Sequence, residues 1–101
     1  MIVYLAGKMY GLPDRGRKKF EEAEERLKRM GHTVLNPAVL PLGLSDEQAM
    51  PICLAMINAS DAIYLLNGFN DSPGARLESE YAGYMRKKIV YEFYEVWDEE
   101  T

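Results

Sequence analysis

Apolar residues recur along the chain with two periods, which predict strands and helices in alternation. In "DRGRKKFEEAEERLKRMG", Phe20, Ala23, Leu27 and Met30 follow helical spacing, and Gly31 suits the position just after a helix. Short runs rich in apolar, β-favouring residues predict buried strands. These runs are "MIVYLAG", "HTVLNP", "DAIYLLNG" and "KIVYEF".

Two further helices are predicted between the strands. The segment "SDEQAMPICLAMINAS" has Ser45 in the position of an N-cap, and Pro51 predicts a break or a restart of that helix. The segment "SPGARLESEYAGYMRK" begins with Ser72 as a cap and Pro73 at the first helical position. The stretch "AVLPLGL" is predicted to be irregular.

The alternation of strands and helices predicts a parallel sheet with helices on both faces. The expected fold class is α/β, a three-layer αβα arrangement with a doubly wound, mostly parallel sheet of four to five strands, flavodoxin- or Rossmann-like. Ligands bind to such sheets outside the carboxyl ends of the strands, where the strand order reverses. This rule indicates the loops at Gly7–Pro13, Asn36–Leu44 and Asn67–Gly74.

Length and composition limit the expected domain organisation and the classes of partner. The 101 residues suit one domain, expected over residues 1–92, with a tail at 93–101 whose acidic end "WDEET" is frayed or docked on a partner. The net charge of −4 argues against a nucleic-acid polymer as partner. No apolar run approaches the ~20 residues of a membrane span, so no membrane partner is expected. A single cysteine, Cys53, and the lack of a signal-peptide pattern fit a cytoplasmic protein.

Glu78 is the most unusual residue of the pattern. It falls on the same stripe of the third helix as Ala75, Ala82 and Met85, and this stripe is expected to face the core. A charge there is costly unless it is partnered or used. Glu78 is therefore either a partly buried carboxylate paired with a cation or a group placed for chemistry, such as the nucleophile or acid/base of glycosyl transfer. By contrast, Glu80 falls on the expected solvated face.

Each of several other residues near the predicted ligand-binding edge of the sheet has either a structural or a functional interpretation. Ser72 and Gly74 are either ordinary capping residues or part of an anion site at a helix N-terminus. Tyr4 is either core packing or a hydroxyl that orients Glu78 and lowers its pKa. Lys8, in the loop "AGKMYG", is only weak evidence for a phosphate-binding site. Asn36, with Pro37, is either part of a turn or an amide for base or sugar contacts.

Metal and cofactor chemistry find little support in the sequence. His32, the single histidine, follows the helix-ending glycine and precedes a strand, so a structural role is expected. There is no Cys/His cluster, which argues against a zinc site. We expect no metal and no cofactor.

Taken together, these residues resemble the nucleoside 2-deoxyribosyltransferase superfamily, most closely a branch of short bacterial and phage proteins. The strongest match is the pattern S-x-G-x-x-x-E-x-x-x-A, formed by Ser72, Gly74, Glu78 and Ala82. Order and spacing make the resemblance specific. The matching pieces, from Met1 to about Glu92, are "VYLAGKMYGLPD", "GHTVLNPA", "SDAIYLLNGFNDSPGARLESEYA" and "KKIVYE".

The resemblance implies roles for individual residues. Glu78 would be the nucleophile, Tyr4 would contact it, and Ser72 would contact a phosphate. The loop from Gly7 to Gly11 would bind the sugar or its 5′-phosphate. The full set of expected substrate-binding residues is Gly7, Lys8, Met9, Asn36, Pro37, Gly68, Ser72 and Gly74.

The chain departs from the family pattern at one position. Relatives carry an aspartate eight residues before the aspartate that opens the third strand, and here Cys53 stands eight residues before Asp61. A contact to a sugar hydroxyl is therefore missing or supplied by another group. The resemblance also implies a homo-oligomer, a dimer or larger, whose sites borrow C-terminal residues, for which the segment "YEFYEVW" is a candidate.

The expected function is cleavage of the N-glycosidic bond of a nucleoside or nucleotide, or transfer of its (deoxy)ribosyl group, through Glu78. The alternative, motivated by Cys53, is a non-catalytic protein that binds a nucleotide to sequester or sense it. An interaction module with a vestigial pocket is the third possibility.

Overall fold

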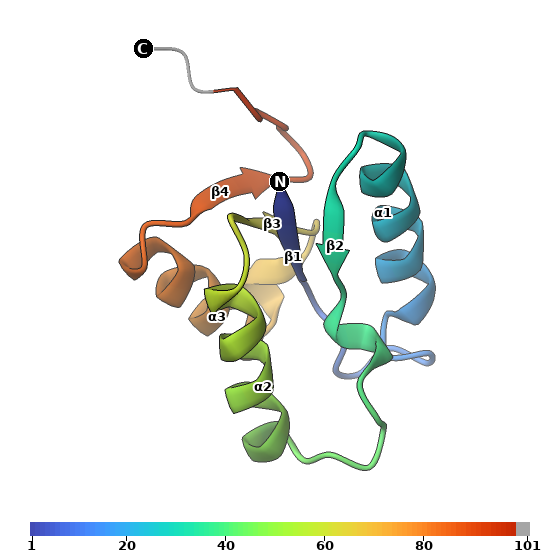
Figure 1. The fold of residues 1–101 in the computed structure, drawn as a ribbon. Coiled ribbons are helices and arrows are strands. Elements are labelled where there is room, and N and C mark those ends of the chain that lie inside the picture. The colour runs from blue at the N-terminus through green and yellow to red at the C-terminus, as the bar shows by residue number, and fades with distance from the viewer. Residues whose placement is uncertain (99–101) are drawn as a thin grey trace.

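Four parallel strands form the centre of the computed structural model, which describes residues 1–98 (Figure 1). The strands are β1 (Ile2–Ala6), β2 (Thr33–Leu35), β3 (Ala62–Leu65) and β4 (Lys88–Tyr91), in the spatial order β2-β1-β3-β4. All three neighbouring pairs are parallel, which confirms the predicted α/β fold. The chain moves from β1 to one side and then crosses to the other, so the strand order reverses between β1 and β3.

The helices cover both faces of this sheet. One helix, α1 (Arg17–Arg29), lies on one face, and two helices, α2 (Asp46–Asn58) and α3 (Pro73–Tyr84), lie on the other. Two short 3-10 helices, η1 (Pro37–Val39) and η2 (Phe69–Asp71), stand at the carboxyl edge. The stretch "AVLPLGL", predicted to be irregular, thus begins inside a 3-10 turn. No helix within residues 1–98 is long and apolar enough to cross a membrane.

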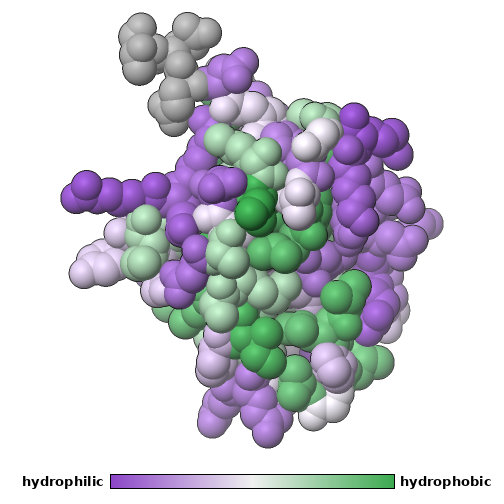
Figure 2. Space-filling view, in the orientation of Figure 1, coloured by the Kyte–Doolittle hydropathy of each residue, from purple (hydrophilic) through white to green (hydrophobic). Residues whose placement is uncertain are grey.

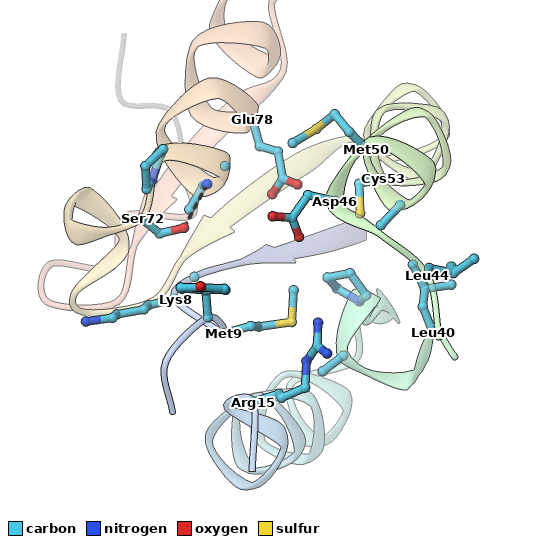
Figure 3. Close-up of a pocket in the computed structure, with 18 of the residues that line it drawn as sticks. Lys8, Met9, Arg15, Leu40, Leu44, Asp46, Met50, Cys53, Ser72 and Glu78 are labelled. Carbon is cyan, nitrogen blue, oxygen red and sulfur yellow. Dashed lines mark hydrogen bonds between the residues drawn. The ribbon is translucent and has the colours of Figure 1, made fainter. Parts of the chain in front are cut away.

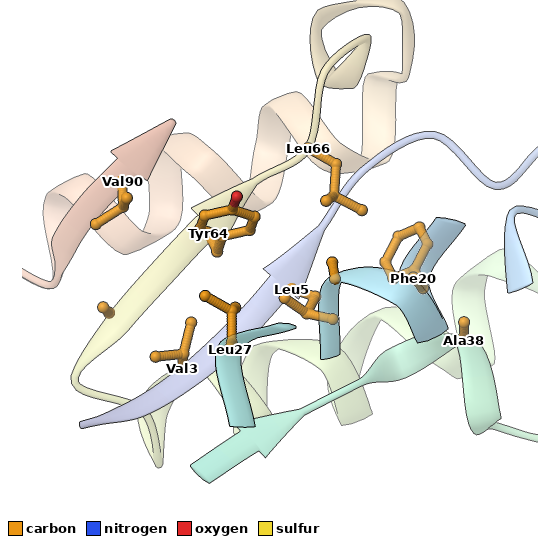
Figure 4. Packing of buried hydrophobic residues seen from close by; sticks show 10 residues of the cluster. Val3, Leu5, Phe20, Leu27, Ala38, Tyr64, Leu66 and Val90 are labelled. Atoms are coloured by element: carbon orange, nitrogen blue, oxygen red, sulfur yellow. The ribbon is translucent and has the colours of Figure 1, made fainter. Parts of the chain in front are cut away.

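Strand β1 builds both halves of the core, because successive residues of a strand point to opposite faces. Val3 and Leu5 pack with Phe20 and Leu27 of α1 (Figure 4). On the other face, alternate β1 residues pack against α2 and α3. This second cluster consists of Tyr4, Ala6, Cys53, Ile57, Ile63, Leu65 and Ala82.

Helix ends follow the sequence signals, with two exceptions. Ser45 caps α2 in a reciprocal capping box with Gln48, and Gly31 follows α1 with a positive φ of 96°. The break predicted at Pro51 is wrong, because α2 runs through it without interruption. Pro51 has no N–H to donate to the Glu47 carbonyl one turn earlier. Both residues are exposed, so water can bind that carbonyl instead. Met85 is also exposed, because α3 ends just before it.

The C-terminal segment folds back on its own chain. Trp97 stacks on His32 and on Tyr64, with ring centroids 4.4 Å and 6.0 Å away. Glu95 pairs with Arg26 at 2.9 Å and accepts a hydrogen bond from the Tyr64 hydroxyl at 2.7 Å. The expectation that this end is frayed or docked on a partner is therefore wrong for Trp97, and residues 99–101 lie outside the described residues. The contacts of His32 are structural, as expected.

Gly7, which follows β1, sits where the backbone passes close to two core side chains. A Cβ atom built on Gly7 would lie 3.0 Å from both Cβ and Cδ1 of Leu66 and 3.3 Å from Cζ of Phe20. Added volume in a packed core forces side chains or backbone to move. The absence of a side chain at Gly7 therefore lets the loop after β1 leave the sheet close to β3.

We expect Gly7→Ala to lower the free energy of unfolding by about 1–3 kcal/mol, because of this overlap. Gly43→Ala is the matched control, since a Cβ there meets no atom within 4 Å and Gly43 has no positive φ. Its stability should stay within about 0.5 kcal/mol of the original protein. Urea unfolding of the three proteins measures the difference. Equal stability of the two variants would show that the contact of Gly7 with Leu66 and Phe20 leaves room for a Cβ atom.

Candidate functional site

A cavity of about 690 Å³ opens at the carboxyl edge of the sheet, beside the reversal of strand order (Figure 3). Its walls come from the β1–α1 loop, from η1 and the loop after it, and from the N-terminal parts of α2 and α3. All three loop regions that the sequence indicated contribute to these walls, and α2 adds a wall that the sequence did not indicate. Figure 2 shows apolar surface gathered around η1 and α2, on the side of the molecule where the cavity lies.

Three elements bring their side chains together at the floor of the cavity. Glu78 comes from the second turn of α3, Cys53 from α2 and Tyr4 from β1. Glu78 is only 7% exposed, because its neighbours on the stripe, Ala75 and Ala82, pack the helix closely against the sheet. The carboxylate points into the cavity, with the Cys53 thiol on the α2 side (Figure 3).

Burial sets the electrostatics of this cluster. It raises the pKa of Glu78 from 4.5 to about 7, and the Tyr4 hydroxyl and Cys53 thiol, as hydrogen-bond donors near the carboxylate, oppose that rise. Burial likewise raises the pKa of the Cys53 thiol. The pKa of Tyr4 is raised far above its usual value, first by burial and then by the charge of Glu78. At neutral pH the cluster therefore holds a half-ionised carboxylate between two neutral donors.

The Tyr4 hydroxyl lies beside the Glu78 carboxylate. It is fully buried, and within the described residues no atom meets hydrogen-bond geometry with it. Glu78 and Cys53 are nevertheless close enough to affect its pKa. An unpaired buried hydroxyl is costly, so a small shift of Glu78 that completes this bond would be favourable.

One side of the cavity suits an anion. Ser72 caps α3, its Oγ accepting a hydrogen bond from the Ala75 N–H at 3.2 Å. Pro73 has no N–H, so the Gly74 N–H is the first one that the helix presents to the cavity. Lys8 lines the same side (Figure 3). Free N–H groups, the helix dipole and a lysine together favour a carboxylate or phosphate group.

The structure brings most of the predicted site residues together. The cavity is lined by Gly7, Lys8, Met9, Pro37, Ser72, Gly74 and Glu78, and Tyr4 lies against Glu78 beneath it. Two others lie outside the lining. Asn36 is buried, accepts a bond from the Ala38 N–H at 2.8 Å and donates one to Glu24 at 2.9 Å. Gly68 precedes η2 with a φ of 89°.

Several lining residues were missed from the sequence. Asp46 and Met50 of α2 face the cavity, as does Cys53, and the spacing i, i+4, i+7 was the available signal. Arg15, which has a positive φ of 57°, lines it from the β1–α1 loop, where no periodic pattern applies. Within residues 1–98, no group of three or more His, Cys, Asp or Glu side chains is arranged to hold a metal ion.

Comparison with known proteins gives one family match. Residues 1–91 match a family described as a domain of unknown function, DUF4406. No curated protein matches the sequence. Similar solved structures include a 2-deoxyribosyltransferase from Leishmania mexicana, with a TM-score of 0.72 and 21% identity over 89% of this chain. The chain spans only 62% of the length of that enzyme.

Two further solved structures have the same fold. The CMP N-glycosidase from Clostridium botulinum has a TM-score of 0.68 and 26% identity, over 90% of this chain and 70% of that one. The 2-deoxyribosyltransferase from Bacillus psychrosaccharolyticus has a TM-score of 0.70 and 21% identity, over 90% of this chain and 71% of that one. The chain therefore has the fold seen in these enzymes of nucleoside glycosyl transfer and cleavage.

The raised pKa of Glu78 makes folding stability depend on pH. The native state holds the Glu78 proton up to about pH 7, whereas the unfolded chain releases it near pH 4.5. The contribution of this group to the free energy of unfolding is therefore complete below about pH 4.5 and is lost as the pH rises to about 7. We expect Glu78→Gln to be about 2–3 kcal/mol more stable than the original protein at pH 8, and no more stable at pH 4.5.

Urea unfolding at pH 4.5, 6 and 8 checks this expectation. Glu80→Gln is the matched control, because Glu80 is exposed on the same helix. It should show no comparable change with pH. A gain in Glu78→Gln that is the same at every pH would contradict the assignment of the shift to Glu78.

Proposed function

The chain belongs to the DUF4406 family, a domain of unknown function. We propose that its pocket cleaves the N-glycosidic bond of a nucleoside or nucleoside 5′-monophosphate, or transfers the (deoxy)ribosyl group, through Glu78. The observation that carries the proposal is the buried Glu78 carboxylate, with a pKa of about 7, at the floor of the cavity. A titratable group shifted by burial within a cleft is typical of a reacting group. Solved structures that share the fold include enzymes with this chemistry, one of them named for CMP.

The proposed reaction is a double displacement. The ionised carboxylate of Glu78 attacks the anomeric carbon of the sugar through an oxocarbenium-like transition state. The electron pair of the C–N bond leaves with the base, which takes up a proton, and a glycosyl-enzyme ester remains. Water or a second base then attacks the same carbon and releases Glu78, which gives hydrolysis or transfer.

Neighbouring groups have supporting roles in this proposal. Tyr4 completes a hydrogen bond to Glu78 and holds the carboxylate ionised and oriented. The first turn of α3, with Ser72 and Gly74, binds the 5′-phosphate or the 5′ end of the sugar, and Lys8 adds a positive charge on the same side. Gly7, Met9 and Pro37 shape the walls, while Asn36 holds η1 through its bond to Ala38.

A second candidate function is favoured by Cys53. The resemblance places an aspartate at this position, whereas here a buried thiol with a raised pKa occupies the floor. A site that lacks this contact to a sugar hydroxyl could bind a nucleotide without turning it over. Tight binding in calorimetry, unaffected by Glu78→Gln and without base release, would favour this sensing or sequestering function.

Base release tests the enzymatic proposal directly. The protein is incubated with a panel of ribo- and deoxynucleosides and their 5′-monophosphates, and free base is followed by chromatography. We expect release from at least one compound and a loss of at least about a thousandfold in Glu78→Gln, since the nucleophile is removed. Glu80→Gln, the matched control on the exposed face of α3, should keep the original rate. Equal rates in Glu78→Gln and the original protein would remove Glu78 from the mechanism.

We also propose that the protein is a homo-oligomer. Large aromatic side chains stay exposed on the single chain, among them Tyr84 at 85%, Phe93 at 70% and Tyr94 at 71%. Two of the three lie in the C-terminal segment after β4. Light scattering at micromolar concentration should give a mass of two or more chains, and a monomeric mass would refute this proposal.

A further inference from the structure

One face of α2 runs from the mouth of the cavity to its floor. Asp46, Met50 and Cys53 occupy positions i, i+4 and i+7 and all line the cavity. With a rise of 1.5 Å per residue, Asp46 and Cys53 are separated by about 10 Å along the helix axis. Asp46 therefore marks the mouth, and Cys53 lies at the floor beside Glu78.

The Asp46 carboxylate has no bonding partner within residues 1–98. It is exposed, and in the part of the chain that the structure describes no hydrogen bond or ion pair is made by its side chain, including none with Arg15. Figure 3 shows the carboxylate directed into the cavity rather than along the outer surface of α2. An ionised carboxylate only accepts hydrogen bonds, so a ligand there must donate one.

Helix capping alone does not account for this placement. Asp46 and Glu47 both lie in the first turn of α2, where a negative charge is favourable. Only Asp46 lines the cavity, and Glu47 does not. The two residues share the effect on the helix dipole and differ in access to a ligand, which makes Glu47 a matched control.

The cavity also has apolar walls that suit a flat, partly apolar ring. Met9, Leu40, Leu44 and Met50 are among their residues. Methionine sulfur makes favourable contacts with aromatic rings, and flexible side chains adapt to their shape. Ser72 and Lys8 lie on the α3 side of the cavity, across from Leu40 and Leu44 (Figure 3), and Met50 reaches toward that side, with its Cε 3.7 Å from a Cβ built on Gly74.

A negative charge at Asp46 would repel a phosphate. Asp71 also lines the cavity beside Ser72, but the N–H groups of the first turn of α3 and Lys8 favour an anion there, so a nucleotide would bind with its phosphate toward Ser72 and its base toward Asp46.

We propose that Asp46 selects nucleobases with an exocyclic amino group, accepting a hydrogen bond from that group at the mouth of the cavity. This inference rests on the proposed function, because it assigns the base end of the same cavity. Cytosine and adenine present an amino group where uracil and hypoxanthine present a carbonyl oxygen. The lone pairs of that oxygen would face those of the carboxylate, so the keto bases are disfavoured.

Two pairs of nucleotides that differ only in this group test the proposal. Binding by calorimetry and base release are measured for CMP against UMP and for AMP against IMP. The original protein should prefer the amino member of at least one pair by about tenfold or more, the worth of a hydrogen bond to a charged group. Asp46→Asn, whose amide also donates, should bring that ratio close to one. Glu47→Gln should leave the ratio unchanged, and both variants should unfold at similar temperatures.

The outcomes separate this inference from the proposed function. Binding or release with no preference for the amino member, or a preference that Asp46→Asn retains, would overturn the role of Asp46 and leave the proposed function standing. A loss of preference in Glu47→Gln as large as in Asp46→Asn would also overturn it, since helix charge alone would then be the cause. If the original protein neither binds nor cleaves any of the four nucleotides, the role of Asp46 is overturned, while the proposed function is decided by base release from the full panel of nucleosides and 5′-monophosphates.

Discussion

Burial of the Glu78 carboxylate is the constraint around which the site is organised. Ala75 and Ala82 are small, so α3 lies close to the sheet, and the residue between them on the same stripe must point at the end of β1. A pKa of about 7 in place of 4.5 corresponds to roughly 3 kcal/mol of lost stability at neutral pH. The fold tolerates this cost while placing two hydrogen-bond donors, Tyr4 and Cys53, near the carboxylate. A merely structural residue at this position would be expected to be apolar.

The thiol of Cys53 gives this floor a different charge from the one that an aspartate would give. Two carboxylates that share a buried site repel each other when both are ionised, so the pKa of one of them is strongly raised. With a neutral thiol in this place, the pKa of Glu78 is set by burial, which raises it, and by the Tyr4 and Cys53 hydrogen-bond donors, which lower it. A thiol at the position where the resemblance implies an aspartate thus leaves Glu78 without a neighbouring carboxylate at that position.

Most of the fold follows from local patterns in the sequence, because each element has strong signals of its own. The apolar runs and the caps at Ser45 and Ser72 predicted the elements and the parallel sheet, and the rule for the reversal of strand order located the cavity. The predicted break at Pro51 was wrong, because the cost of a proline within a helix depends on whether water reaches the carbonyl that loses its hydrogen bond. A sequence does not show that exposure. Asp46 was missed since charged residues are common in a first helical turn. Trp97 was missed because its partners, His32 and Tyr64, are brought together only by the folded sheet.

The place of Trp97 has a practical consequence for spectroscopy. It is the single tryptophan of the chain, and it packs against the core cluster on the α1 side of the sheet, stacked on the histidine that precedes β2. The cavity lies at the other end of the strands, and Trp97 is not among its lining residues. Intrinsic fluorescence therefore reports whether the C-terminal segment is seated on the sheet. It is a natural probe of the integrity of the fold, and occupancy of the cavity has to be followed with a different signal.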